Sequence, residues 1–340
     1  MNRSELTELT ALLCRQPGIS GDEMQAAKTA AEILGRWCPD ARITQGNVTG
    51  TCGSTDPDAP HVLLDAHMDQ VGLIVTSVTD DGFITAGNVG GLDRRLFPDQ
   101  RVKIFGTQEI YGIVSCLPPH LTNGEEKVLT YETLRIDTGY PAEALREIVH
   151  PGDSIVFDGV TGMLPGGRFT SPALDDRCGV AAILYALDEL KGEELPCKVT
   201  VLFSAQEEVG ERGAAVGCYT ADPDIALAVD VSFAGDRKFS KTGEMGGGAM
   251  IGYSPSLSRE VSDDLTDAAL AEEIPYQVEV MAGTTGTNAD RFSVCRGGVK
   301  ACTVSIPLDY MHTAAEVIDL ADVEYTGRLL AAYLRRCVTC

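Results

Sequence analysis

The stretch "KVTVLFSAQEE", residues 198–208, decides the fold class. A mostly apolar run ends here at two adjacent glutamates, Glu207 and Glu208. Runs of this kind are typical of strands that are buried on both faces, as in the sheets of α/β proteins. Three other segments have the same character: "HVLLDAH" (61–67), "IALAVDV" (225–231) and "VKACTVSIP" (299–307). The sequence therefore predicts a buried sheet, and it raises the question of why two like charges follow one of its strands.

Segments with helical periodicity alternate with these strands. Apolar residues recur at helical spacing in residues 4–15, 22–37, 177–190, 259–273 and 320–336. Helices that alternate with buried strands indicate an α/β fold, with a central mixed sheet covered by helices on both faces.

Residues 70–165 have a different pattern. Short apolar segments there are broken by Gly, Asp-Gly and Pro, which are turn signals. This pattern predicts a small all-β, barrel-like domain at 70–165. It would be inserted into an α/β domain formed by residues 1–69 and 166–340.

Composition limits the classes of function. The chain has 340 residues and a net charge of −23, which argues against nucleic acid or an anionic membrane as a partner. No apolar run approaches the roughly 20 residues that span a bilayer. The N-terminus resembles an amphipathic helix rather than a secretory signal, so we expect a cytoplasmic protein.

The eleven cysteines are irregularly spaced, and we expect them to be reduced thiols. One Cys-x-x-Cys pair, Cys337 and Cys340, ends the chain. A zinc site would require a second pair or two histidines nearby, and the sequence offers neither there. We therefore interpret this pair as a C-terminal tail.

Polar residues gather where the predicted strands end. Ligands of open α/β sheets bind beyond the carboxyl ends of the strands. The residues that we expect at this edge, from four strand ends and one helix start, are His67, Asp69, Asp175, Asp176, Glu207, Glu208, Asp230 and His312.

Each residue alone has an ordinary structural explanation. His67 would be a hydrogen-bonded histidine, Asp175 a helix N-cap, and Asp230 a turn residue. Together, however, clustered carboxylates without Lys or Arg partners would repel one another unless a cation lay among them. Mixed His and carboxylate ligands suit Zn²⁺, Co²⁺ or Mn²⁺. Asp69, two residues after His67, would share a face with it and hold its far ring nitrogen.

Five motifs resemble the M42 metallo-aminopeptidases, which include tetrahedral (TET) and glutamyl aminopeptidases and proteins once labelled endoglucanase M. The motifs are "AHMDQVG" (66–72), "PALDDRCG" (172–179), "SAQEEVGERGA" (204–214), "AVDV" (228–231) and "YMHTAAE" (310–316). The resemblance covers essentially the whole chain. It implies a zinc-peptidase-like catalytic domain, and an inserted β domain that mediates dimerisation.

The resemblance also implies roles for individual residues. His67, Asp175 and Asp230 would bind one divalent ion, zinc by analogy with the family, with Co²⁺ or Mn²⁺ as alternatives. Asp175 would bridge to a second ion, bound also by Glu208 and His312.

Glu207 would then be the general base. It would take a proton from a water shared by two ions about 3.5–4 Å apart and pass it to the leaving amine. The substrates would be peptides with a free N-terminus. Family members commonly form homo-oligomers in which dimers assemble into a tetrahedral dodecamer.

Some residues depart from the family pattern. Gln70 and Asn288 stand where acidic residues are usual, and Thr313 stands where Ser is common. Neither the preferred N-terminal residue nor the native metal follows from the sequence.

Three alternatives remain open. The first is another metal-dependent amidohydrolase, a deacylase or carboxypeptidase, on the same scaffold. The second is a glycosidase that uses Glu207 and Glu208, although adjacent residues of an extended chain project to opposite faces. The third is a non-catalytic member of the scaffold.

Overall fold

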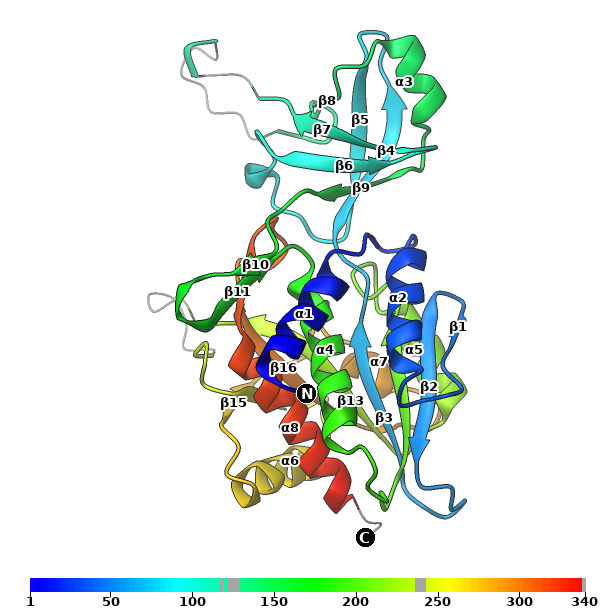
Figure 1. The fold of residues 1–340 in the computed structure, drawn as a ribbon, viewed down its shortest axis with the longest axis vertical. Coiled ribbons are helices and arrows are strands. Elements are labelled where there is room, and N and C mark those ends of the chain that lie inside the picture. Colours follow the sequence, from blue (N-terminus) through cyan, green and yellow to red (C-terminus); the bar gives the residue numbers. More distant parts are fainter. Residues whose placement is uncertain (117–118, 122–128, 236–242, 338–340) are drawn as a thin grey trace.

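The computed structural model describes residues 1–116, 119–121, 129–235 and 243–337. Within them the chain forms a large mixed sheet covered by helices and a separate closed barrel, which Figure 1 shows above the sheet. This arrangement confirms the predicted α/β class with an additional β barrel.

Four parallel strands form the centre of the large sheet. Its strands, in spatial order, are β1 (Arg42–Thr44), β2 (Asn47–Gly53), β12 (Lys198–Ser204), β3 (His61–His67), β13 (Ile225–Phe233), β16 (Lys300–Asp309), β17 (Glu316–Asp319), β11 (Arg168–Ser171) and β10 (Gly162–Met163). β14 (Ala249–Tyr253) pairs with β16, and β15 (Tyr276–Val280) pairs with β14. β12, β3, β13 and β16 are parallel neighbours, and every residue of β3 is buried. These four strands are the four apolar runs of the sequence, and their carboxyl ends lie at one edge.

Helices cover both faces of this sheet. They are α1 (Arg3–Cys14), α2 (Met24–Leu34), α4 (Leu174–Glu189), α5 (Arg212–Ala221), α6 (Arg259–Ala271), α7 (Ala289–Phe292) and α8 (Leu320–Arg336). In Figure 1, α1, α4 and α8 lie in front of the sheet and α7 lies behind it; α4 packs on β3 and β13, and α7 on β16. Among the described residues, no helix combines the length and the apolar character needed to cross a bilayer.

The barrel has its own hydrophobic core. Its strands, in order around the barrel, are β4 (Gly72–Val78), β5 (Phe83–Val89), β8 (Ile136–Asp137), β7 (Glu109–Val114), β6 (Arg101–Phe105) and β9 (Ser154–Phe157). Buried and exposed residues alternate along β7, with the apolar side inward. Leu73, Ile84, Val102 and Ile136 are among the residues that fill the interior.

The segment predicted as all-β also contains a helix and a strand of the large sheet. α3 (Ala142–Ile148) buries only Leu145, so its sequence carries little of the periodicity that marks a longer helix. β10 lies within the segment 70–165 but pairs with β11, and therefore belongs to the large sheet. Three short 3-10 turns complete the described elements: η1 (Arg94–Leu96), η2 (Pro119–Leu121) and η3 (Pro165–Gly167).

The cysteines of the described residues are all free thiols. Most are buried, for example Cys178 in α4 and Cys302 in β16, where a thiol behaves as a small apolar group. Of the C-terminal pair, Cys337 is buried and Cys340 lies outside the described residues.

Candidate metal centre

The register of the parallel strands places the first candidate residues side by side. His67 is the last residue of β3, and its partner across the pair is Ser204, the last residue of β12. Glu207 and Glu208 follow three and four residues later. Asp230 lies near the end of β13, on the other side of β3. The chain thus brings a histidine and three carboxylates to one end of the sheet.

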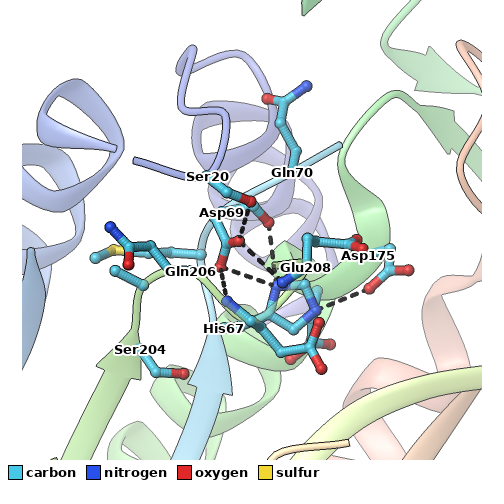
Figure 2. A network of polar contacts seen from close by, with 12 residues as sticks. Ser20, His67, Asp69, Gln70, Asp175, Ser204, Gln206 and Glu208 are labelled. Atoms are coloured by element: carbon cyan, nitrogen blue, oxygen red, sulfur yellow. Dashed lines mark hydrogen bonds and ion pairs between the residues drawn. The ribbon is translucent and has the colours of Figure 1, made fainter. Parts of the chain in front are cut away.

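Asp175 lies at the centre of the group. It stands at the start of α4, where its backbone angles are not helical, so the carboxylate faces the strand ends. Its Oδ1 lies 3.0 Å from His67 Nε2, a contact drawn in Figure 2. Its Oδ2 lies 3.2 Å from Nε2 of His312, in the loop after β16. One carboxylate therefore faces a different imidazole with each of its oxygens.

Asp230 and Glu208 complete two sets of ligand atoms. Asp230 Oδ1 lies 3.9 Å from His67 Nε2, and Glu208 Oε1 lies 3.1 Å from His312 Nε2. Three overlapping groups each have ligand atoms within 4.8 Å of one another. They are His67–Asp175–Asp230, Asp175–Glu208–His312 and His67–Glu207–Glu208.

Asp176 does not join these groups. It is fully buried, and its Oδ1 accepts a hydrogen bond of 3.2 Å from the backbone N–H of Gly179 inside α4. Of the two adjacent aspartates, only Asp175 belongs to the candidate centre.

The hydrogen bonds of the histidines fit a metal site. His67 Nδ1 lies 3.1 Å from the Asp69 carbonyl oxygen, and His312 Nδ1 lies 2.7 Å from the Gly91 carbonyl oxygen. A carbonyl oxygen can only accept, so each Nδ1 carries a proton and donates it. In a neutral ring Nε2 then offers a lone pair, which points at carboxylate oxygens that can also only accept. A divalent cation between them resolves this opposition, and the donor types suit Zn²⁺ and similar ions.

The pKa directions lead to the same conclusion. Burial raises the pKa of Glu207 to about 8 and that of Asp230 well above its usual range. Burial opposes protonation of His312, but the carboxylates of Asp175 and Glu208 raise its pKa to about 11. The cluster therefore favours bound positive charge, either as protons or as cations that replace them.

Asp69 joins the two strand ends. Its Oδ1 accepts the backbone N–H of Glu207 at 3.0 Å, and its Oδ2 accepts that of Glu208 at 3.2 Å and the Ser20 hydroxyl at 2.6 Å. Burial acts to raise the pKa of Asp69, but His67 and these donors hold it below its usual value. The carboxylate lies 3.6 Å from His67 Nδ1, farther than the Asp69 backbone carbonyl. Figure 2 shows Asp69 between Ser20 and His67, where it fixes the histidine and the glutamate backbone together.

Arg177 has a positioning contact that the sequence reasoning did not identify. Its guanidinium is 1% exposed and donates to the carbonyl oxygens of Met68 at 2.8 Å and Leu13 at 2.6 Å. Met68 lies between His67 and Asp69, so this buried cation fixes the segment that carries both. The motif "PALDDRCG" contains Arg177, but nothing in its spacing shows which carbonyl groups it binds.

A turn from the barrel approaches the site. Besides the carbonyl of Gly91 on His312, Gly90 lies against Glu208, with φ of 77°. A Cβ added at Gly90 would lie 2.7 Å from Val71 Cγ1 and 3.3 Å from Glu208 Cβ. A residue with a side chain would therefore meet both strain and steric conflict here. The two glycines of "NVGG" were the available signal for this close approach.

The two departures from the family pattern lie beside the centre. Gln70 and Asp175 line the same small cavity, and Gln70 Oε1 lies 3.5 Å from the Arg177 guanidinium. Asn288 donates to the buried carboxylate of Asp65 at 2.7 Å and to the Ser204 hydroxyl at 2.8 Å. Neither amide is a candidate ligand; Gln70 contacts Arg177, and Asn288 donates to Asp65 and Ser204.

The cavity at this site is small. A space of about 10 Å³, lined in part by Asp175, Glu208 and His312, has room for about one water molecule. Two larger cavities, of about 560 and 670 Å³, share Cys52 in their walls and contain none of the candidate ligands. The convergent polar groups, rather than cavity volume, identify the site.

Comparison with known proteins agrees with this geometry. The model of the M42 glutamyl aminopeptidase family matches residues 46–329. The lysyl aminopeptidase of Pyrococcus furiosus is 31% identical over 339 residues, 96% of each chain. The glutamyl aminopeptidase of Lactococcus lactis is 30% identical, over 85% of this chain and 84% of that one. The structure of the Pyrococcus horikoshii TET1 peptidase, described as assembling into a tetrahedron or a large octahedral shell, has a TM-score of 0.88. It is 29% identical, and the match covers 98% of this chain and 100% of that one.

Proposed function

Since the chain belongs to the M42 glutamyl aminopeptidase family, and is thus a peptide-bond hydrolase, we propose that it is a dinuclear metal aminopeptidase. It would release N-terminal residues from peptides. The observation that carries this proposal is the Asp175 carboxylate, each of whose oxygens faces a different histidine Nε2.

Five residues would hold the ions. His67, Asp175 and Asp230 form the first set, and Asp175, Glu208 and His312 form the second. Zn²⁺ is the first choice for this donor set, with Co²⁺ or Mn²⁺ as alternatives. When bound, the ions would act as Lewis acids that acidify water and polarise the peptide carbonyl.

Glu207 would move the proton. Its carboxylate lies beside His67 and Glu208, and burial raises its pKa above the usual value for a glutamate. Bound cations would favour the charged carboxylate, which is the form that accepts a proton. One carboxylate oxygen would accept a proton from the attacking water and deliver it to the nitrogen of the leaving amine. Asp69 would keep Glu207 in place through the backbone N–H that it accepts.

The assembly is also part of the proposal. The inserted domain, with the predicted boundaries 69/70 and 165/166 and with β10 pairing in the large sheet, would mediate dimerisation. The dimers would build a tetrahedral dodecamer. Tyr111 and Ile113 on the outer side of β7 support this role, because they are exposed by 54% and 43%. The P. horikoshii relative can assemble into a tetrahedron or a large octahedral shell. A cytoplasmic location stays a prediction, which cell fractionation would test.

A substrate panel tests the activity. We expect aminoacyl-p-nitroanilides with a free α-amine to be cleaved, and their N-acetyl counterparts to be untouched. Chelation should abolish cleavage, and added Zn²⁺ or Co²⁺ should restore it. Cleavage of only the N-acylated compounds would instead identify a deacylase. Failure to cleave any member of a panel covering all aminoacyl groups, with either metal, would contradict the proposal. The names of the relatives include both lysyl and glutamyl aminopeptidases, so the panel must cover both charges.

A further inference from the structure

Glu316, the first residue of β17, connects two parts of the candidate centre. Its side chain is buried, and the residue is 2% exposed. Oε1 accepts the backbone N–H of His312 at 2.8 Å, and Oε2 accepts the backbone N–H of Asp175 at 3.1 Å. The two donors are 137 residues apart in the chain, and both belong to the group Asp175–Glu208–His312.

A carboxylate is a costly choice of acceptor at a buried position. Burying its charge is unfavourable unless hydrogen bonds compensate for the lost water. A neutral acceptor would satisfy one N–H at lower cost. A planar carboxylate, however, has two oxygens at a fixed separation, and its hydrogen bonds are stronger than those of neutral acceptors. Glu316 can therefore set the distance between two backbone segments, because each segment donates to a different oxygen of one planar group.

The side chains of these two segments also contact each other. His312 Nε2 and Asp175 Oδ2 lie 3.2 Å apart, and the other ring nitrogen of His312 is held by Gly91. The backbone N–H of Asp175 donates to the Glu316 carboxylate. The separation of the two ligands thus depends on the Glu316 carboxylate.

We propose that Glu316 is a positioning residue that sets the spacing of Asp175 and His312 for one of the two cations. This inference rests on the proposed function, since it concerns the same metal centre. Glu316 itself would touch neither the ions nor the substrate. Its loss should weaken the ion bound by Asp175, Glu208 and His312 far more than the ion bound by His67, Asp175 and Asp230.

Asp322 provides a matched control. It is also fully buried, and its carboxylate also accepts two backbone N–H groups, from Gly246 at 2.6 Å and Gly248 at 2.8 Å. It belongs to none of the three candidate metal groups. Glu316→Gln and Asp322→Asn therefore remove the same kind of interaction, one at the centre and one away from it.

The experiment is a titration of the metal-free full chain with Co²⁺ alone, followed by calorimetry and by the visible absorption of the bound ion. We expect two ions in the wild type. In Glu316→Gln one ion should bind about 10–100-fold more weakly, the usual effect of removing a group that orients a ligand. Asp322→Asn should match the wild type. Glu208→Ala should keep only the ion bound by His67, Asp175 and Asp230. Adding Glu316→Gln to this variant should weaken the binding of that ion by no more than about threefold.

The outcomes distinguish failure of the proposed function from failure of the positioning role of Glu316. A wild type that binds no Co²⁺ would overturn the proposed function, and this inference with it. Two ions in the wild type and unchanged affinities in Glu316→Gln would overturn the positioning role alone. Equal weakening of both ions would also overturn it, because that indicates general loosening. Near-UV circular dichroism checks folding; if Glu316→Gln does not fold, Glu316→Asp, with its shorter carboxylate, takes its place with the same expected selectivity.

Discussion

Glu207 and Glu208 are adjacent in the chain but differ in their contacts. Glu208 Oε1 lies 3.1 Å from His312 Nε2, and Glu208 belongs to the group with Asp175 and His312 as well as to the group with His67. Glu207 belongs only to the group with His67 and Glu208. Asp69 holds the backbone of both, one N–H on each carboxylate oxygen. This difference gives each glutamate its own proposed task, and two substitutions separate the tasks.

Glu207→Gln tests the proton transfer. The amide keeps the size of the side chain but cannot accept the proton of water, so we expect kcat to fall about 10²–10⁴-fold. Metal content, measured by mass spectrometry of the purified protein, should stay at the wild-type value. Simultaneous loss of metal and activity would contradict the division of roles between Glu207 and Glu208.

Glu208→Ala tests the metal role. Removing this carboxylate leaves Asp175 and His312 as the only members of the second set. We expect the metal content to drop from two ions to one per chain, measured after dialysis against a weak chelator. Retention of both ions at wild-type affinity would show that Glu208 is not a ligand.

For single residues, the sequence predicts many of the candidate site residues but not the contacts that hold them in position. His67, Glu207 and Asp230 could be proposed because each follows or ends an apolar run whose carboxyl end is recognisable. Arg177 donates to the carbonyl oxygen of Met68, 109 residues away in the chain. The carbonyl oxygen of Gly91 contacts His312, 221 residues away. Such contacts depend on how distant segments pack, and no local pattern encodes them.

Among the elements, the turn between β5 and η1 is one part of the barrel that approaches the centre. Gly90 and Gly91 lie against Glu208 and His312, so the barrel contributes to ligand placement. The barrel therefore affects the metal site as well as any role it has in assembly.

Gly90→Ala should disturb this turn. The positive φ strains any residue with a Cβ, and Glu208 and Val71 would have to move. We expect a loss of about 1–2 kcal/mol in the free energy of unfolding together with weaker metal binding. Gly139→Ala is the control, because Gly139 also has positive φ, 73°, but has nothing within 4 Å of the added Cβ. Equal metal affinity in the two variants would contradict the proposed role of the turn.

Asp322, in the first turn of α8, gives a pH-dependent term in stability. Burial raises its pKa to about 6, despite the N–H groups of Gly246 and Gly248. Between the unfolded value, about 3.9, and 6 the folded state binds more protons than the unfolded state. The free energy of unfolding therefore falls as the pH rises through this window, by about 2 kcal/mol for this group.

Asp322→Asn removes that term. In urea unfolding of the metal-free chain, the stability of the variant relative to the wild type should rise between pH 4 and pH 6.5 and stay constant above it. Parallel pH profiles for the two proteins would show that Asp322 does not titrate in this range.

The strands were predicted more accurately than the short helices. β3 matches its apolar run residue for residue, and β12 begins with its run at Lys198 and ends at Ser204, before the two glutamates. Strands buried on both faces are marked by composition alone. α7 has four residues and α3 has seven, too few to show a period of 3.6. β10 pairs by backbone hydrogen bonds across a turn, and its two residues, Gly162 and Met163, are too few to show the pattern of a strand.

For the whole molecule, the outer face of β7 is the proposed dimer contact. Tyr111→Asp with Ile113→Asp should place two charges on that face and reduce the mass of the assembly toward the monomer, measured by light scattering. Leu270→Asp is the control, since Leu270 is also exposed, by 60%, but lies on α6, outside the barrel. An unchanged mass in the double variant would contradict dimerisation through β7.

The central claim is that two cations share Asp175. The most direct measurement is anomalous X-ray scattering at the zinc absorption edge from crystals of the full chain grown with Zn²⁺. We predict two peaks per chain, one bounded by His67, Asp175 and Asp230 and the other by Asp175, Glu208 and His312. A single peak, or zinc bound away from Asp175, would contradict the account.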